Sequence, residues 1–224
     1  LASEGEGIKS AVFEAGDSSI VYLTYEGGTI NGKDTLIVNN LEDANGNTMS
    51  TPDSVAFYAG ITSIATIQDT TGSGSDYSAL YGETVTVAAI VTGGDASFGS
   101  SQFVQDAPGP WNGVNVYTWV YDLVRGDSVM ITGTVTEYYN KTEIEDVLQA
   151  VVLASGVDLP AAYETTVADM DTNESLEGVL VDLGKVAVTD PSLGSGEFQV
   201  TDATGNGIVD DAGSYSYSPV AGDS

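Results

Sequence analysis

Short runs of β-branched and aromatic residues recur along the chain, and clusters of glycine, asparagine and aspartate separate them. Apolar runs of this length between turn-forming residues predict β-strands. The expected strands cover residues 19–25, 34–38, 84–91, 114–120, 128–135, 178–181 and 185–188. Many short strands at regular spacing are typical of a sandwich or a barrel, so the sequence predicts an all-β protein.

Two stretches of small and polar residues divide the chain. Residues 69–76 have the composition of a linker or long loop, and residues 155–162, with Pro160, form a second junction. We therefore expect four parts, namely an N-terminal β-domain at 1–60, a linker at 61–79, and two further β-domains at 80–158 and 159–224.

The two C-terminal domains carry an internal repeat. Three landmarks recur in the same order with offsets of 94 to 96 residues: 85–87 with 179–181, 99–106 with 194–202, and 126–128 with 222–224. A nearly constant offset indicates two copies of one structural unit.

The second copy of the repeat is shorter than the first. The first copy continues into the expected strand 129–135, whereas the second stops at Ser224. We therefore expect the last domain to lack its closing strands, and an open sheet edge recruits a further strand. Either the polypeptide continues past Ser224 or a neighbouring molecule supplies that strand.

The residues that carry the repeat also suggest a family. They are residues 80–87, 90–92, 103–106 and 126–138, with residues 177–181 beginning the second copy. This pattern resembles the OB-fold domains of secreted bacterial extracellular nucleases and related surface proteins. The resemblance implies two OB-fold Greek-key barrels, the second incomplete, but it says little about activity because OB-folds have many functions.

The N-terminal part resembles the back half of a bacterial Ig-like domain, on residues 19–23, 35–38, 41–47 and 55–57. This likeness implies a partial Ig-like β-sandwich and, with the incomplete last barrel, a piece of a larger secreted multidomain protein. Residues 142–154 have apolar positions at helical spacing and end in a strand-like run at 151–153. We expect a strand there because the family pattern requires one.

The composition excludes much chemistry. The 224 residues include 33 Asp and Glu, 5 Lys and Arg, and neither Cys nor His, so the net charge is −28. Thiolate nucleophiles, zinc–sulfur sites and imidazole bases are therefore excluded, and we expect no enzyme. Five cations cannot line a groove for phosphates, so direct nucleic-acid binding is not expected. No apolar run reaches the ~18 residues of a membrane span.

The high acidity fits solubility, high-salt surroundings or divalent-cation binding outside the cell, and an acidic solvated surface with no specific partner explains it equally well. Ca²⁺ prefers oxygen ligands. Two segments have oxygen ligands at alternate positions, namely Asp43, Asn45 and Asn47, and Asp169, Asp171 and Asn173. The first also fits a simple Asn-Gly turn and the second a solvated loop, since neither has the full ligand pattern of an EF-hand.

Aromatic residues offer a candidate stacking platform for bases or sugars. Trp111, Tyr117 and Trp119 are close in sequence, and alternation places the last two on one side of a strand. Packing in a core or interface explains the same residues. The acidic run 143–146 suggests no acid–base pair, because neighbouring acids on a strand point to different faces.

These observations predict a non-catalytic extracellular or cell-surface structural protein, a scaffold or a filament or adhesion subunit. It would associate with itself or with other domains of a larger polypeptide, with Ca²⁺ as the possible cofactor. The alternative is an accessory nucleic-acid- or polysaccharide-binding module of a secreted nuclease or other hydrolase.

Overall fold

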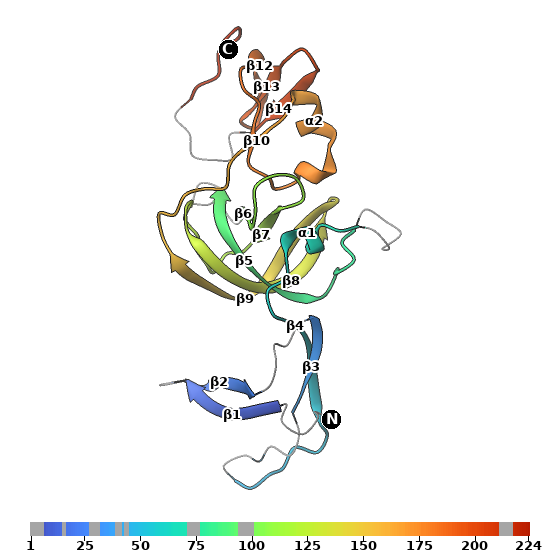
Figure 1. Cartoon of the computed structure of the whole chain (residues 1–224), viewed down its shortest axis with the longest axis vertical. Helices are drawn as coiled ribbons and strands as arrows, with labels where there is room; N and C mark the ends of the chain where they lie inside the picture. The colour runs from blue at the N-terminus through green and yellow to red at the C-terminus, as the bar shows by residue number, and fades with distance from the viewer. Residues whose placement is uncertain are drawn as a thin grey trace.

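The computed structural model describes residues 7–14, 17–26, 32–38, 42, 45–70, 77–93, 101–210 and 217–224. Most of the elements in these ranges are β-strands, which confirms the all-β prediction. Figure 1 shows two N-terminal hairpins, a central barrel and a C-terminal unit that follow one another along the longest axis.

The N-terminal hairpins are two separate two-stranded sheets. Strand β1 (Gly7–Glu14) pairs antiparallel with β2 (Asp17–Glu26), and β3 (Gly32–Val38) pairs antiparallel with β4 (Asp53–Ala59). The strands expected at 19–25 and 34–38 lie within β2 and β3.

The central part is a closed five-stranded barrel. Its strands are β5 (Thr84–Gly93), β6 (Ser101–Gln105), β7 (Gly113–Tyr117), β8 (Ser128–Tyr138) and β9 (Lys141–Ala154). They close in the order β5-β6-β7-β9-β8, and the β7–β9 pair is the parallel one. Residues 142–154 are thus a strand, as expected, whereas β7 ends at Tyr117 rather than at residue 120.

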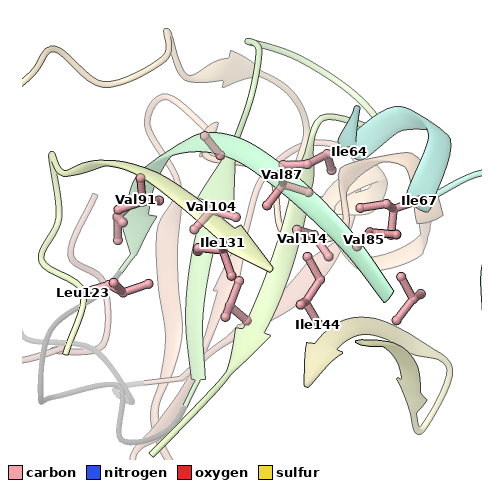
Figure 2. Packing of buried hydrophobic residues seen from close by; sticks show 14 residues of the cluster. Ile64, Ile67, Val85, Val87, Val91, Val104, Val114, Leu123, Ile131 and Ile144 are labelled. Atoms are coloured by element: carbon pink, nitrogen blue, oxygen red, sulfur yellow. The ribbon is translucent and has the colours of Figure 1, made fainter. Parts of the chain in front are cut away.

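Alternating apolar residues fill the barrel. Buried and partly exposed residues alternate along β5 and β8, because successive side chains of a strand point to opposite faces. Figure 2 shows the resulting cluster, in which Val87, Val104 and Ile131 are fully buried. Full burial of such a side chain contributes about 1.5–3 kcal/mol, so this cluster dominates the stability of the barrel.

A short helix extends this core into the segment expected to be a linker. Helix α1 (Ile64–Ile67) begins after Ser63, whose side chain accepts a hydrogen bond from the Thr66 amide. Ile64 and Ile67 have no exposed surface and belong to the barrel core. Part of the segment expected to be a linker thus contributes two side chains to the barrel core, and residues 71–76 lie outside the described ranges.

The C-terminal unit is smaller and more open. It contains β10 (Tyr163–Glu164) parallel to β11 (Val181–Asp182), helix α2 (Val167–Thr172), the 3₁₀ turn η2 (Glu174–Leu176), and a three-stranded sheet of β12 (Ala187–Gly194), β13 (Glu197–Thr201) and β14 (Asn206–Val209).

The first long strand of the C-terminal unit is interrupted. The runs expected at 178–181 and 185–188 become strands only from Val181 and Ala187. Between them, Gly184 has a φ of 63° and donates its amide to the Asp182 carboxylate at 2.7 Å. This Asx turn bends the chain, which a pattern of apolar residues alone does not reveal.

Candidate functional site

The repeat seen in the sequence is also a repeat of hydrogen bonds. In the barrel, the Asp106 carboxylate accepts the first amide of α1, from Ile64, at 2.8 Å. In the C-terminal unit, the Asp202 carboxylate accepts the first amide of α2, from Val167, at 3.0 Å. The two aspartates are 96 residues apart (202 − 106), and each follows a strand directly, β6 in the barrel and β13 in the C-terminal unit.

A second pair of contacts repeats with offsets of 97 residues for the strand residue (188 − 91) and 96 for the turn (222 − 126). Val91 of β5 exchanges two backbone hydrogen bonds with the turn at 126–127, both of 2.9 Å. Val188 of β12 exchanges the same two bonds with the turn at 222–223, at 2.9 and 2.8 Å. The glycine of each turn has a left-handed φ, 88° in the first and 91° in the second. The two units therefore share one architecture up to these turns.

The units differ after these turns. In the barrel, β8 starts at Ser128 and runs antiparallel along β5 from Ile90 to Thr84, and β9 then pairs with β7. In the C-terminal unit, the equivalent turn leads to Ser224. Within the described residues, no strand takes the places of β8 and β9 beside β12 and β14.

A groove of about 510 Å³ lies on this open side of the C-terminal unit. Its walls are mainly apolar, and the lining residues are Leu183, Gly184, Lys185, Val186, Val188, Phe198, Val200, Val209, Tyr217, Asp223 and Ser224. In the barrel, β8 covers this side of β5, where Val87 lies opposite the fully buried Ile131. The groove borders the turn at 222–223, which corresponds to the turn at 126–127 where β8 begins in the barrel.

The groove has the chemistry of a strand acceptor. It combines an apolar floor at Val188, Phe198 and Val200 with sheet edges whose backbone groups can pair with an added strand. Leu183 and Val186 of the same cluster are only partly buried. We take this open face, the groove and the edges of β12 and β14, as the candidate site and call it the acceptor face.

The junction between the two units is tight and was not foreseen. A Cβ added at Gly113 would lie 2.3 Å from the backbone of Gly178, so the two backbone segments are in contact at these glycines. The Trp111 amide donates to the Ser175 carbonyl at 2.7 Å, and the Leu180 amide donates to the Gln105 side chain at 2.6 Å. These bonds fix the acceptor face relative to the barrel.

Glu177 lies in this junction as a half-buried carboxylate. Its Oε1 accepts hydrogen bonds from the Thr142 amide at 2.9 Å and from the Gln68 side chain at 3.4 Å. Burial outweighs these bonds and, with the charges of Glu174 and Glu137, raises the pKa of Glu177 to about 7. The sequence offers no signal for this, because the partners come from three distant segments.

The structure brings together two of the three candidate stacking residues. Tyr117 and Trp119 meet edge to face, with ring centroids 6.1 Å apart and planes at 85°. They line a groove of about 740 Å³ on the barrel, although Trp119 follows β7 instead of lying within it. Trp111 lines a separate cavity of about 480 Å³ beside α1.

The first candidate calcium segment is a turn in the part that is described. Gly46 has a left-handed φ of 83° and lies between Asn45 and Asn47, inside an antiparallel bridge from Glu42 to Thr48. Asp43 lies outside the described residues.

The second candidate calcium segment lies on and just after helix α2. The Asp169 carboxylate accepts a hydrogen bond from the Thr166 hydroxyl at 3.0 Å, and the Asn173 side chain caps η2 through the Ser175 amide at 3.1 Å. Asp171 is exposed in the last turn of α2. Among the residues the structure describes, no three acidic side chains are placed to hold a metal ion.

No protein-family model, curated protein or solved structure matches this chain. Across the described ranges, no helix has both the length and the apolar character needed to cross a membrane.

Proposed function

We propose that this chain is a non-catalytic structural part of an extracellular scaffold, filament or adhesin, and that its acceptor face binds a β-hairpin from outside residues 1–224, either from a neighbouring subunit or from another part of a larger polypeptide. The observation that carries this proposal is the apolar groove on the C-terminal unit, which borders the turn at 222–223, the counterpart of the turn where β8 begins in the barrel. Because the C-terminal unit repeats the hydrogen bonds of Asp106 and Val91 in the barrel, we infer that a hairpin like β8 and β9 could pair with it.

The strand order supports assigning the barrel to the OB-fold. Five strands close with β5, β6 and β7 adjacent and with β9 placed between β7 and β8, which is a Greek-key arrangement. On this assignment the C-terminal unit is a second OB-fold with its first three strands in place. The N-terminal hairpins would belong to an Ig-like domain.

The gain from hairpin binding is estimated from the barrel. There, β8 and β9 bury Val129, Ile131, Val135 and Ile144 completely. At about 1.5–3 kcal/mol for each side chain, four such residues contribute on the order of 6–12 kcal/mol before the entropy of ordering the hairpin is subtracted.

The source of the hairpin determines the assembly. A hairpin from a second copy would give a head-to-tail contact, which extends into a filament instead of closing. Each subunit carries a net charge of −28, so neighbouring subunits repel one another. Divalent cations would then promote assembly by screening that repulsion, without requiring a dedicated site.

A chimeric chain tests the acceptor face directly. Residues 129–158 are appended after Ser224, since Ser224 corresponds to Ser128 with the offset of 96 (224 − 128). The segment ends beyond Val157, whose amide closes onto Gly126 at 2.9 Å in the barrel. If the proposal is correct, the added hairpin closes the second barrel, protects the amides of β12 from exchange, and removes self-association.

The matched control carries aspartate in place of the inward-facing Val129, Ile131 and Val135 of the appended copy only. This control is expected to leave β12 unprotected. Equal protection of β12 in the two chimeras, or in neither, would contradict the acceptor face.

Assembly of the unmodified chain is measured by sedimentation and electron microscopy in Ca²⁺ and in EDTA. Filaments or larger species in Ca²⁺ that dissociate in EDTA support the filament form. A chain that stays monomeric at high concentration in Ca²⁺ contradicts the filament form while leaving the chimera test of the acceptor face unaffected.

The groove at Tyr117 and Trp119 favours a second candidate function, an accessory binding module of a secreted hydrolase. Direct binding of DNA would weaken steeply with added salt. No retention on DNA at low salt, with or without Ca²⁺, would exclude the nucleic-acid form of this candidate.

A further inference from the structure

We propose that the first barrel binds neutral polysaccharide chains in the groove between the Tyr117–Trp119 corner and residues 145–148 of β9. This site is independent of the acceptor face, because the two grooves share no lining residue. The volume of about 740 Å³ lies within the ~300–1,000 Å³ of typical ligand pockets.

The floor of this groove is a row of side chains across neighbouring strands. Thr84 of β5 lies opposite Thr134 of β8, and Thr134 lies opposite Glu145 of β9. The parallel pairing of β7 with β9 ends at Val116 and Ile144. Beyond this point the paired ladder stops, and Tyr117 lines one wall of the groove.

The aromatic wall is unusually exposed for its size. Trp119 is 77% exposed, and the neighbouring Val120 and Leu148 are 80% and 69% exposed. Exposed apolar surface gathered in one place marks a binding surface more often than scattered residues do. The perpendicular rings of Tyr117 and Trp119 form a corner against which the C–H face of a pyranose ring can pack.

The opposite wall carries the carboxylates of Glu145 and Asp146 beside Val147 and Leu148, and its backbone is strained at Asp146. Asp146 has a φ of 45°, which is rare for a residue other than glycine, and it lies at the irregularity where β9 shifts its register against β8. Such a conformation costs about 1–3 kcal/mol and persists where the fold or function requires it. A bulge of this kind redirects side chains, and here it brings Asp146 and Glu145 to one groove.

The carboxylates of Glu145 and Asp146 favour a neutral ligand over an anionic one. Two carboxylates and no lysine or arginine line the groove, so an anionic phosphate backbone would be repelled. Hydroxyl groups donate strong, charge-assisted hydrogen bonds to carboxylates. Desolvation, with the nearby charges of Glu143 and Asp146, also raises the pKa of Glu145. A neutral polyhydroxylated chain that stacks on Trp119 fits both walls.

The test uses the full chain and four neutral probes, cellohexaose, maltohexaose, chitohexaose and mannohexaose, followed by calorimetry and tryptophan fluorescence. The matched variants are Trp119→Ala and Trp111→Ala, because Trp111 lies in the separate cavity beside α1. We expect at least one probe to bind, with Trp119→Ala weakening binding about tenfold or more and Trp111→Ala changing it less than about twofold.

A second variant, Asp146→Asn, keeps a residue that tolerates the left-handed backbone and removes the charge. We expect it to weaken binding severalfold with an unchanged circular dichroism spectrum. The proposal is overturned if none of the four probes binds at millimolar concentration, if Trp119→Ala binds as the wild type does, or if an oligothymidylate binds at this groove instead. Loss of saccharide binding would leave the acceptor face untouched, since the chimera measures a different surface.

Discussion

The replacement Glu177→Gln at the junction between the two units should change how stability depends on pH. Glu177 is half-buried, and its Oε1 accepts hydrogen bonds from the Thr142 amide and the Gln68 side chain. Glutamine retains an acceptor oxygen at the same place and cannot ionise. The variant therefore isolates the effect of the negative charge.

The sign follows from the pKa of Glu177, which burial raises from 4.5 to about 7. Between these two values the folded protein binds more protons than the unfolded chain, so the wild-type free energy of unfolding falls as pH rises. A shift of this size corresponds to an upper limit of about 3 kcal/mol for a group shielded from water. Because Glu177 is only half-buried, we expect about 1–2 kcal/mol.

The assay is urea unfolding of the wild type and Glu177→Gln from pH 4.5 to pH 8, at constant ionic strength. The variant should match the wild type near pH 4.5 and be more stable by about 1–2 kcal/mol at pH 8. The control, Glu164→Gln, removes the same charge from an exposed position and should show no such pH dependence. A difference between Glu177→Gln and the wild type that stays constant over the whole range would refute the argument.

Two further predictions concern the packing of the units. The substitution Gly113→Ala places a Cβ 2.3 Å from the Gly178 carbonyl and should lower the free energy of unfolding by about 2–4 kcal/mol in the same urea assay. The control is Gly205→Ala, whose Cβ would be 3.7 Å from its nearest neighbour, and it should change the free energy of unfolding by less than about 1 kcal/mol. Hydrogen bonds from Thr204 and from backbone amides lower the pKa of Asp202 to about 2, so the stability that Asp202 gives to α2 should be present above pH 3.8 and be lost as pH falls toward 2. Amide exchange over residues 167–172 should show this acid loss in the wild type and not in Asp202→Ala, which lacks the α2 contact at every pH.

The sequence predicts the elements that depend on local pattern. Strands β5, β7 and β8 follow from runs of β-branched and aromatic residues, and the repeat follows from landmarks 94 to 96 residues apart. Strand β6 was not among the expected strands, and β9 was expected only from the family pattern. Helix α1 was missed because its four residues are too few to show a periodicity. Its burial depends on Asp106, which is distant in sequence.

The candidate sites divide in the same way. Tyr117 and Trp119 were foreseen as neighbours because they are close in sequence, although Trp119 follows the strand. Their groove includes Asp146, whose left-handed backbone conformation the sequence pattern does not predict. The junction at Gly113 and Gly178 depends on close contact between two backbone segments from different units. A glycine in a sequence does not indicate which other segment packs against it.

The open face of the C-terminal unit and the covered face of the barrel carry the same type of residue and differ in how far their side chains are buried. Val85 and Val87 of β5 are fully buried, whereas Val181, Leu183 and Val186, which precede Val188 in the C-terminal unit, are apolar but only partly buried. A surface that had evolved to remain in water would carry polar residues at these positions, because exposed apolar area costs about 25 cal/mol per Å². Under the proposed function, a further β-hairpin would cover this apolar face and bury these residues as β8 buries Val85 and Val87 in the barrel.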